Sequence, residues 1–130
     1  MSLKYRTRKV VKPGDLNSGN TLFGGRILEW IDEECGVYAA CQMKTKTLVT
    51  KYMSELNFLA PAYQGDVVEI GVDTVDVTRT TIAVTCHVRI KETKEEIVSI
   101  DKVVFVNVDE NGRPSRHGNY PYVPNEDGGE

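Results

Sequence analysis

The sequence predicts an α+β fold in which an antiparallel β-sheet wraps around one long central helix. Two observations carry this prediction. Between residues 15 and 41, apolar side chains recur at helical spacing: Phe23, Ile27, Ile31, Cys35 and Tyr38. Later segments instead alternate apolar and polar residues and are joined by short turns, which is typical of antiparallel strands. A buried helix beside half-buried strands indicates two packed layers.

The predicted helix follows a loop of turn-forming residues at 17–20 and a glycine pair at 24–25. We expect it to end near residue 41. Trp30 and Val37 widen its apolar stripe beyond what one exposed face needs. We therefore expect the sheet to wrap the helix, so that the helix forms the core of the domain.

Five strands are expected, at 5–11, 48–59, 67–77, 81–90 and 97–108. The apolar residues of the third strand change parity between Val72 and Val75, which predicts a bulge or a bend there. Past Gly112 the chain is rich in proline and glycine and has no period. We therefore expect one domain over residues 1–115 and a flexible C-terminal tail over residues 116–130.

Composition excludes several classes of protein. A chain of 130 residues is enough for one core, and a net charge of −3 provides no basic field for nucleic acid. The three cysteines form no CxxC or Cys/His cluster, so neither a disulfide framework nor a zinc site is indicated. No apolar run reaches the length of a signal peptide or a membrane span. We expect a cytoplasmic protein with reduced thiols that does not bind membranes.

The start of the helix is a candidate site for an electrophile. Unpaired backbone N–H groups and the helix dipole suit a carbonyl oxygen that develops negative charge, and glycines let a ligand approach closely. Asp32 follows Gly25 by seven residues, so it lies on nearly the same helix face, about 10 Å further along the axis. These two features form half of a hydrolytic site. The alternative for Asp32 is a solvated carboxylate, like the nearby Glu29 and Glu33.

Four blocks of residues, taken together and in order, resemble the hotdog-fold acyl-CoA thioesterases over about the first 115 residues. The blocks are Pro13-x-Asp15-x-Asn17 leading to Phe23-Gly24-Gly25 and Asp32; Asn57-Phe58-x-x-Pro61-x-x-x-Gly65-Asp66; Arg79-Thr80-Thr81; and Val104-Phe105-Val106-x-Val108-Asp109-x-x-Gly112-Arg113-Pro114. The chain departs from the family pattern at three places: Thr78 replaces a usual glycine, Glu33 and Glu34 follow Asp32, and Asn20 replaces another glycine.

The resemblance implies hydrolysis of acyl-CoA thioesters to a free acid and CoA, without a metal or a cofactor. Asp32 would be the general base, or a nucleophile that forms a mixed anhydride. Asn17 would orient water and substrate, and the N–H of Gly24 or Gly25 would polarise the thioester carbonyl. Phe23, Arg79, Thr80 and Thr81 are the candidates for contact with substrate and coenzyme. For Arg79 the alternative is an ordinary exposed strand start.

The resemblance also implies a homo-oligomer. In such proteins two protomers pair their sheets, and Asn17 of one faces Asp32 of the other at the interface; these dimers often assemble into hexamers. Two other functions stay open: a non-catalytic acyl-CoA-binding module, and a hydratase or dehydratase of the same fold. The latter needs an Asp/His pair on the loop beside the helix, where neither His87 nor His117 falls.

Overall fold

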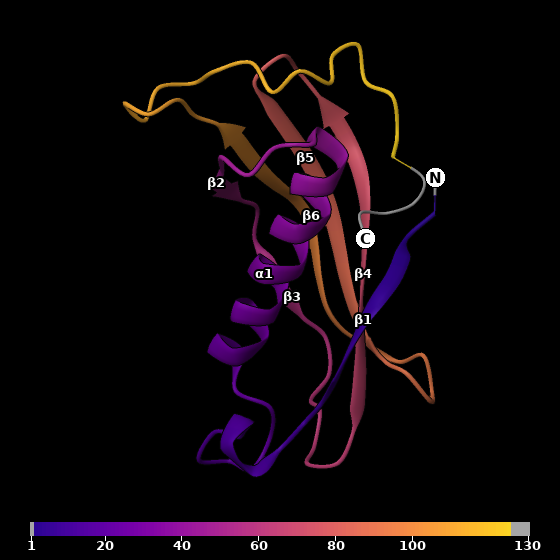
Figure 1. Cartoon of the computed structure of the whole chain (residues 1–130). Helices are drawn as coiled ribbons and strands as arrows, with labels where there is room; N and C mark the ends of the chain where they lie inside the picture. The colour runs from indigo at the N-terminus through magenta and orange to yellow at the C-terminus, as the bar shows by residue number, and fades with distance from the viewer. Residues whose placement is uncertain (1, 126–130) are drawn as a thin grey trace.

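The computed structural model describes residues 2–125 and shows one long helix packed across a six-stranded antiparallel sheet (Figure 1). A short 3-10 helix, η1 (Pro13–Asp15), precedes the long helix α1 (Gly24–Met43). The strands are β1 (Lys4–Val10), β2 (Leu48–Met53), β3 (Leu56–Phe58), β4 (Val67–Val77), β5 (Thr81–Ile90) and β6 (Glu96–Asn107). The predicted α+β arrangement is confirmed. The helix continues past its expected end until Lys44, which adopts a left-handed conformation with φ of 56°.

The strand order in the sheet is β1-β4-β5-β6-β2, with β3 also paired to β6. The segment 48–59, expected as one strand, forms two strands that both pair with β6. Ser54 interrupts it because its hydroxyl oxygen accepts the Lys102 backbone N–H at 3.1 Å. The irregularity predicted in the third strand is confirmed, since the register of β4 shifts between Thr74 and Asp76.

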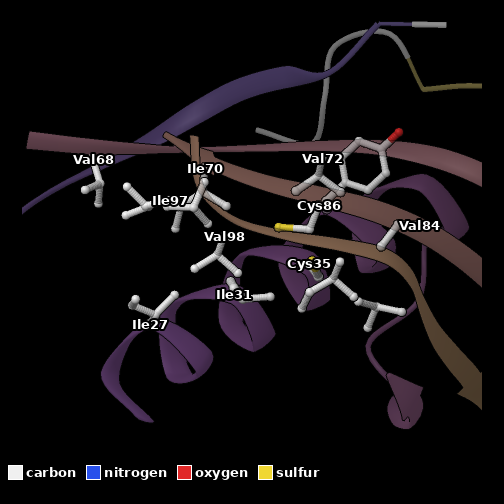
Figure 2. Packing of buried hydrophobic residues seen from close by; sticks show 14 of the residues in the cluster. Ile27, Ile31, Cys35, Val68, Ile70, Val72, Val84, Cys86, Ile97 and Val98 are labelled. Carbon is white, nitrogen blue, oxygen red and sulfur yellow. The ribbon is translucent and has the colours of Figure 1, made fainter. Parts of the chain in front are cut away.

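The core lies between α1 and the inner face of the sheet (Figure 2). The helix residues at the predicted spacing are buried: Ile27, Ile31, Cys35 and Tyr38. They pack in one cluster with residues of β4 and β5, which include Val68, Ile70, Val72, Val84 and Cys86. Phe23, the first residue of the predicted pattern, is instead 54% exposed, because it precedes the helix as its N-cap residue.

The opposite face of α1 is not covered by any segment within residues 2–125. Val37 is 54% exposed and Leu28 is 37% exposed, whereas Trp30 is partly buried against the core. Within residues 2–125 the single sheet covers one face of the helix. On the other face, the apolar stripe that Val37 widens is exposed.

Residues 115–125, which we call the strap, pass across the C-terminal end of α1 (Figure 1). Asn107 at the end of β6 is buried and donates to two strap carbonyls, both at 3.2 Å. Further along, Asn119 donates to the Gln42 carbonyl at 2.6 Å, and the Asn125 N–H donates to the Gln42 side chain at 3.0 Å. The flexibility expected of the tail stays a prediction, and its part beyond Asn125 lies outside the described residues.

Within residues 2–125, no helix is long and apolar enough to cross a membrane. The helix α1 carries acidic residues along its exposed face, namely Glu29, Asp32 and Glu33. The cytoplasmic location expected from the sequence stays a prediction.

Candidate active site

The loop before α1 is closed by the side chain of Asn17. Its amide oxygen accepts the backbone N–H groups of Gly19 at 2.9 Å and of Thr21 at 3.1 Å. Its amide nitrogen donates to the Thr21 hydroxyl at 3.0 Å. Asn20 takes a left-handed conformation with φ of 64°, which asparagine tolerates as expected. Asn17 therefore shapes the loop, and its part in orienting water stays a prediction.

The N-terminus of α1 presents amide groups without acceptors. Phe23 is the N-cap residue and has no side-chain acceptor, and no group in the described chain accepts the backbone N–H of Gly24 or Gly25. Aromatic rings flank the glycines: a β-carbon on Gly25 would lie 2.7 Å from the Phe23 ring, and one on Gly24 would lie 3.5 Å from Phe58. These N–H groups can donate to a carbonyl oxygen placed beside the rings.

Asp32 lies on the exposed face of α1, where the Thr50 hydroxyl of β2 donates to its Oδ1 at 2.8 Å. Neighbouring acids have other partners. Glu29 forms an ion pair at 2.6 Å with an arginine one turn earlier, and Glu34 accepts a hydrogen bond from a threonine of β1. The Oδ2 of Asp32 has no hydrogen-bond partner among residues 2–125, so this oxygen can accept a proton from water.

A groove of about 390 Å³ runs along the exposed face of α1 from Asp32. Its lining residues are Asp32, Glu33, Gly36, Val37 and Ala40 of α1, together with Lys46, Leu48, Thr50 and Phe105. The Phe105 ring lies 3.8 Å from the place where a β-carbon on Gly36 would sit. Small and apolar side chains therefore form much of the surface, which suits an aliphatic chain.

Arg79 and Thr80 lie in the turn between β4 and β5, and Thr81 is the first residue of β5. Thr78 closes this turn, because its hydroxyl lies 2.7 Å from the Thr81 hydroxyl and accepts the Thr81 N–H at 3.1 Å. The Thr80 hydroxyl has no partner in the described part of the chain, whereas that of Thr81 is engaged. Arg79 is exposed, and its guanidinium carbon lies 5.0 Å from the centre of the Tyr120 ring.

The predicted site residues fall into three groups within one chain. Asn17, Phe23 and the glycine pair lie at the N-terminal end of α1, and Asp32 lies about 10 Å along the axis. The turn that carries Arg79 lies near the other end of the helix (Figure 1). The groove at Asp32 is lined by neither Asn17 nor Arg79. A single chain does not gather these groups around one substrate atom.

Sequence reasoning does not single out Thr50 or Phe105 as site residues, and it includes Phe58 only as part of a block. Thr50 lies on an edge strand without clear alternation, and only the packing of α1 beside β2 brings its hydroxyl to Asp32. Phe105 lies in the last of the four blocks and in an apolar run that indicates a buried strand, and neither assigns it to a site.

The cysteines and His87 offer no reactive group beside Asp32 within residues 2–125. Cys35 is buried, and its hydrogen bond with the Cys86 thiol and then its burial raise the pKa of the Cys35 thiol well above its usual range. His87 lies 2.9 Å from Glu96. Within residues 2–125, no three His, Cys, Asp or Glu side chains gather as a metal site would need. The expectation that no metal or cofactor takes part stays a prediction.

One helix across an antiparallel sheet, with a carboxylate on the exposed helix face, is the architecture of the hotdog-fold proteins. The sequence model of the thioesterase superfamily matches residues 19–97, which is more than half of the chain. The chain belongs to the thioesterase superfamily.

Two curated relatives are similar to this chain. An uncharacterized acyl-CoA thioester hydrolase of Bacillus subtilis, YkhA, is 35% identical over 115 residues, which cover 82% of this chain and 66% of YkhA. An uncharacterized acyl-CoA thioester hydrolase of Haemophilus influenzae is 31% identical over 112 residues, which cover 82% of this chain and 72% of that protein. The alignment thus spans just under two thirds of the length of YkhA.

Three solved structures are also similar. The hexameric thioesterase y2039 from Yersinia pestis has a TM-score of 0.81 at 22% identity, covering 89% of this chain and 96% of that one. An aspartate-to-alanine mutant of HI0827, a hexameric broad specificity acyl-coenzyme A thioesterase, has a TM-score of 0.79 at 25% identity. The match covers 93% of this chain and 91% of that one. Cj0915, a hexameric hotdog fold thioesterase of Campylobacter jejuni, has a TM-score of 0.71 at 28% identity, covering 86% and 88%. The predicted hotdog fold is confirmed.

Proposed function

We propose that this protein hydrolyses acyl-CoA thioesters to a free carboxylic acid and CoA. The observation that carries the proposal is Asp32, whose carboxylate accepts a hydrogen bond from Thr50 at the head of an apolar groove. A thioester has a good leaving group, so one base and one electrophilic donor suffice for its hydrolysis. Two relatives named as acyl-CoA thioester hydrolases support the same reaction.

In this reaction Asp32 is the general base. Its free oxygen takes a proton from water while the water oxygen bonds to the thioester carbonyl carbon. The N–H of Gly24 or Gly25 donates to the resulting oxyanion, an interaction typically worth about 2.7–4 kcal/mol in the transition state. The tetrahedral intermediate then breaks its carbon–sulfur bond, and the CoA thiolate takes up the proton. Thr50 keeps the carboxylate aimed at the water.

The complete site requires two chains. Gly25 and Asp32 are about 10 Å apart along one helix. In the reaction, the water held by the base must lie about 3 Å from the thioester carbonyl carbon, and the oxyanion donor must lie about 3 Å from the carbonyl oxygen. These two groups of one chain are therefore too far apart to act on the same carbonyl. Asp32 of one subunit therefore faces the Asn17 loop and the glycine N–H groups of the other. The separation within one chain and the absence of Asn17 from the Asp32 groove support this arrangement.

Exposed apolar side chains support assembly through the same face. They lie on α1, β2 and β3: Leu28, Val37, Val49, Tyr52 and Phe58, which are 37–58% exposed. The strand β2 is an edge of the sheet, and an edge strand with exposed apolar side chains pairs readily with a second copy. The compared thioesterases are hexameric, which supports a trimer of such dimers.

The substrate is an acyl-CoA whose aliphatic chain lies in the groove beside Asp32. The turn with Arg79, Thr80 and Thr81 receives the phosphates of the coenzyme, since a guanidinium and hydroxyls are donors that phosphate oxygens accept. Phe23 contacts the substrate near the thioester. Water and these side chains supply the whole reaction, so CoA enters as part of the substrate and no separate cofactor is required.

The test measures release of free CoA thiol from a panel of acyl-CoAs, from acetyl-CoA to palmitoyl-CoA. Asp32→Asn keeps an oxygen for the Thr50 hydroxyl but removes the base, so we expect kcat to fall about 10²- to 10⁴-fold. Glu29→Gln is the matched control, because it neutralises another exposed carboxylate of α1. It should turn over at the wild-type rate.

Turnover by Asp32→Asn at the wild-type rate would contradict the assignment of the base. Binding of acyl-CoA by the wild-type protein without turnover at any chain length would contradict hydrolysis altogether. That outcome would favour the non-catalytic acyl-CoA-binding module. Thermal melting and sedimentation of each variant show whether it is still folded and assembled.

A further inference from the structure

The strap is joined to the β4–β5 turn through His117, which is only 8% exposed. Its ring Nε2 lies 2.6 Å from the Thr78 carbonyl oxygen, and its Nδ1 accepts the Asn119 backbone N–H at 3.0 Å. The His117 backbone N–H also donates to the Arg79 carbonyl at 3.2 Å. One buried histidine therefore makes two hydrogen bonds that connect the turn and the strap, and a third within the strap.

These bonds fix the form of the imidazole. A backbone N–H can only donate, so Nδ1 of His117 carries the lone pair and Nε2 carries the proton that goes to the Thr78 carbonyl. Both ring nitrogens are satisfied in this neutral tautomer. A side chain with a single polar atom, or with none, cannot bridge Thr78 and Asn119 in the same way.

The bridge holds an aromatic ring against Arg79. Tyr120 follows Asn119 in the strap, and its ring centre is 5.0 Å from the Arg79 guanidinium carbon. Stacking restricts a long side chain that would otherwise be mobile, and it leaves the N–H edge of the guanidinium open. The strap itself is secured at Gln42, to which Asn119 and Asn125 both hydrogen-bond.

Arg79 differs in this respect from Arg89, another arginine stacked on a tyrosine. Arg89 lies 3.6 Å from the centre of the Tyr5 ring and 3.4 Å from a Glu69 oxygen, so its charge is neutralised within the fold. Across residues 2–125, no carboxylate lies within ion-pair distance of Arg79. An oriented cation without an internal partner is suited to an anion from outside.

We propose that His117 is a positioning residue for coenzyme recognition. By bridging the turn and the strap it keeps Tyr120 stacked on Arg79, so the guanidinium is oriented before a phosphate ester arrives. This inference rests on the proposed function, in which Arg79 meets a phosphate of CoA. Pre-orientation lowers the entropic cost of ordering the Arg79 side chain on binding, so we expect it to change the affinity for the substrate.

The test compares two thioesters of the same acyl group: the acyl-CoA, and the N-acetylcysteamine thioester, which has the reacting group and no phosphate. His117→Ala and Tyr120→Leu should each raise KM for the acyl-CoA about three- to tenfold, with kcat unchanged. Neither should change the kinetics of the truncated thioester. His117→Gln should recover most of the loss, because its amide can donate to the Thr78 carbonyl.

Two further variants complete the design. His87→Ala is the matched control, because it removes a histidine that is hydrogen-bonded elsewhere on the sheet, to Glu96. Its KM should equal that of the wild-type protein. The double variant Arg79→Ala/His117→Ala should have the same KM for the acyl-CoA as Arg79→Ala alone, since the histidine acts through the arginine.

An equal rise in KM for both thioesters in His117→Ala would overturn the positioning role and leave His117 a structural residue. Additive effects of Arg79→Ala and His117→Ala on KM for the acyl-CoA would do the same. If the wild-type protein hydrolyses neither thioester, the proposed function fails. Calorimetric titration with CoA then tests the role of His117 independently of hydrolysis. Weaker CoA binding by His117→Ala with a wild-type melting temperature would support it. Equal binding by the two proteins would overturn it.

Discussion

Cys35 shows how the core holds a polar atom without making it reactive. The residue is fully buried in α1 beside Cys86 of β5 (Figure 2). The hydrogen bond with the Cys86 thiol and the burial raise the pKa of the Cys35 thiol well above its usual range. The thiol therefore stays protonated at neutral pH and behaves as a small apolar side chain.

Alkaline pH should destabilise the protein through this thiol. In the unfolded chain a cysteine has a pKa near 8.5, so above about pH 8.5 the unfolded chain has lost a proton that the folded protein keeps. The free energy of unfolding should fall by up to about 1.4 kcal/mol per pH unit until the folded pKa is reached. Urea unfolding between about pH 8 and pH 10 measures this slope, and Cys35→Ala should make it shallower. The same slope in both proteins would contradict the argument.

Residues that carry chemistry can be predicted more readily than the residues that support them. Asp32 and the glycine pair lie within one segment, so helical spacing alone relates them. Thr50 comes from a different element, and its contact with Asp32 exists only after β2 has packed beside α1. A pattern within one segment carries no information about such a pair.

Among the elements, those held by apolar side chains were predictable, whereas the hydrogen bonds that anchor the strap were not. Strands β4 and β5 follow from alternation, and the buried stripe of α1 follows from its helical period. The strap is held by polar side chains instead, among them Asn107, His117 and Asn119. Apolar periodicity indicates which hydrocarbon side chains are buried. It carries no signal for a segment that is held by hydrogen bonds, and such a segment therefore resembles a tail in the sequence.

Asn107→Asp should loosen the strap at its first anchor. Asn107 is 5% exposed, and its amide donates to two strap carbonyls while its oxygen accepts from the hydroxyls of Thr45 and Thr47. A carboxylate of the same size would face both carbonyls without a proton to donate. We expect a loss of roughly 2–4 kcal/mol in the free energy of unfolding at neutral pH, measured by urea unfolding.

Asn111→Asp is the control for this substitution. Asn111 lies in the exposed turn at 109–112, where only its backbone N–H is engaged, with Asp109 at 2.8 Å. Its replacement should change the free energy of unfolding by less than about 0.5 kcal/mol. A similar loss in both variants would show that the Asn107 donors do not hold the strap.

At the scale of the whole molecule, residues 2–125 do not bring the candidate site residues together around one groove. The uncovered face of α1 and the edge strand β2 lie on the same side, and both expose apolar side chains. Sequence periodicity shows that Val37 is part of an apolar stripe, but it cannot tell a surface that faces the sheet from one that faces another copy. For this reason sequence periodicity did not reveal which face of α1 is exposed.

Val49→Lys should dissociate the assembly. A lysine on an edge strand opposes pairing with a second strand, because its charge would have to lose water at the interface. We expect sedimentation to shift toward the monomer and thioester hydrolysis to fall with it. Val75→Lys is a matched control, since Val75 on β4 is also 46% exposed and lies away from β2. A fully active monomer of Val49→Lys would contradict a site shared between subunits.

The position of β6 in the sheet has a consequence for biosynthesis. This strand lies between β5 and β2 and also pairs with β3, yet of the six strands within residues 2–125 it leaves the ribosome after all the others. Until it emerges, β2 and β3 have no partner, and α1 has only part of the surface on which it packs. The nascent domain therefore cannot close progressively from its N-terminus, and folding of the sheet must wait until β6 has been made.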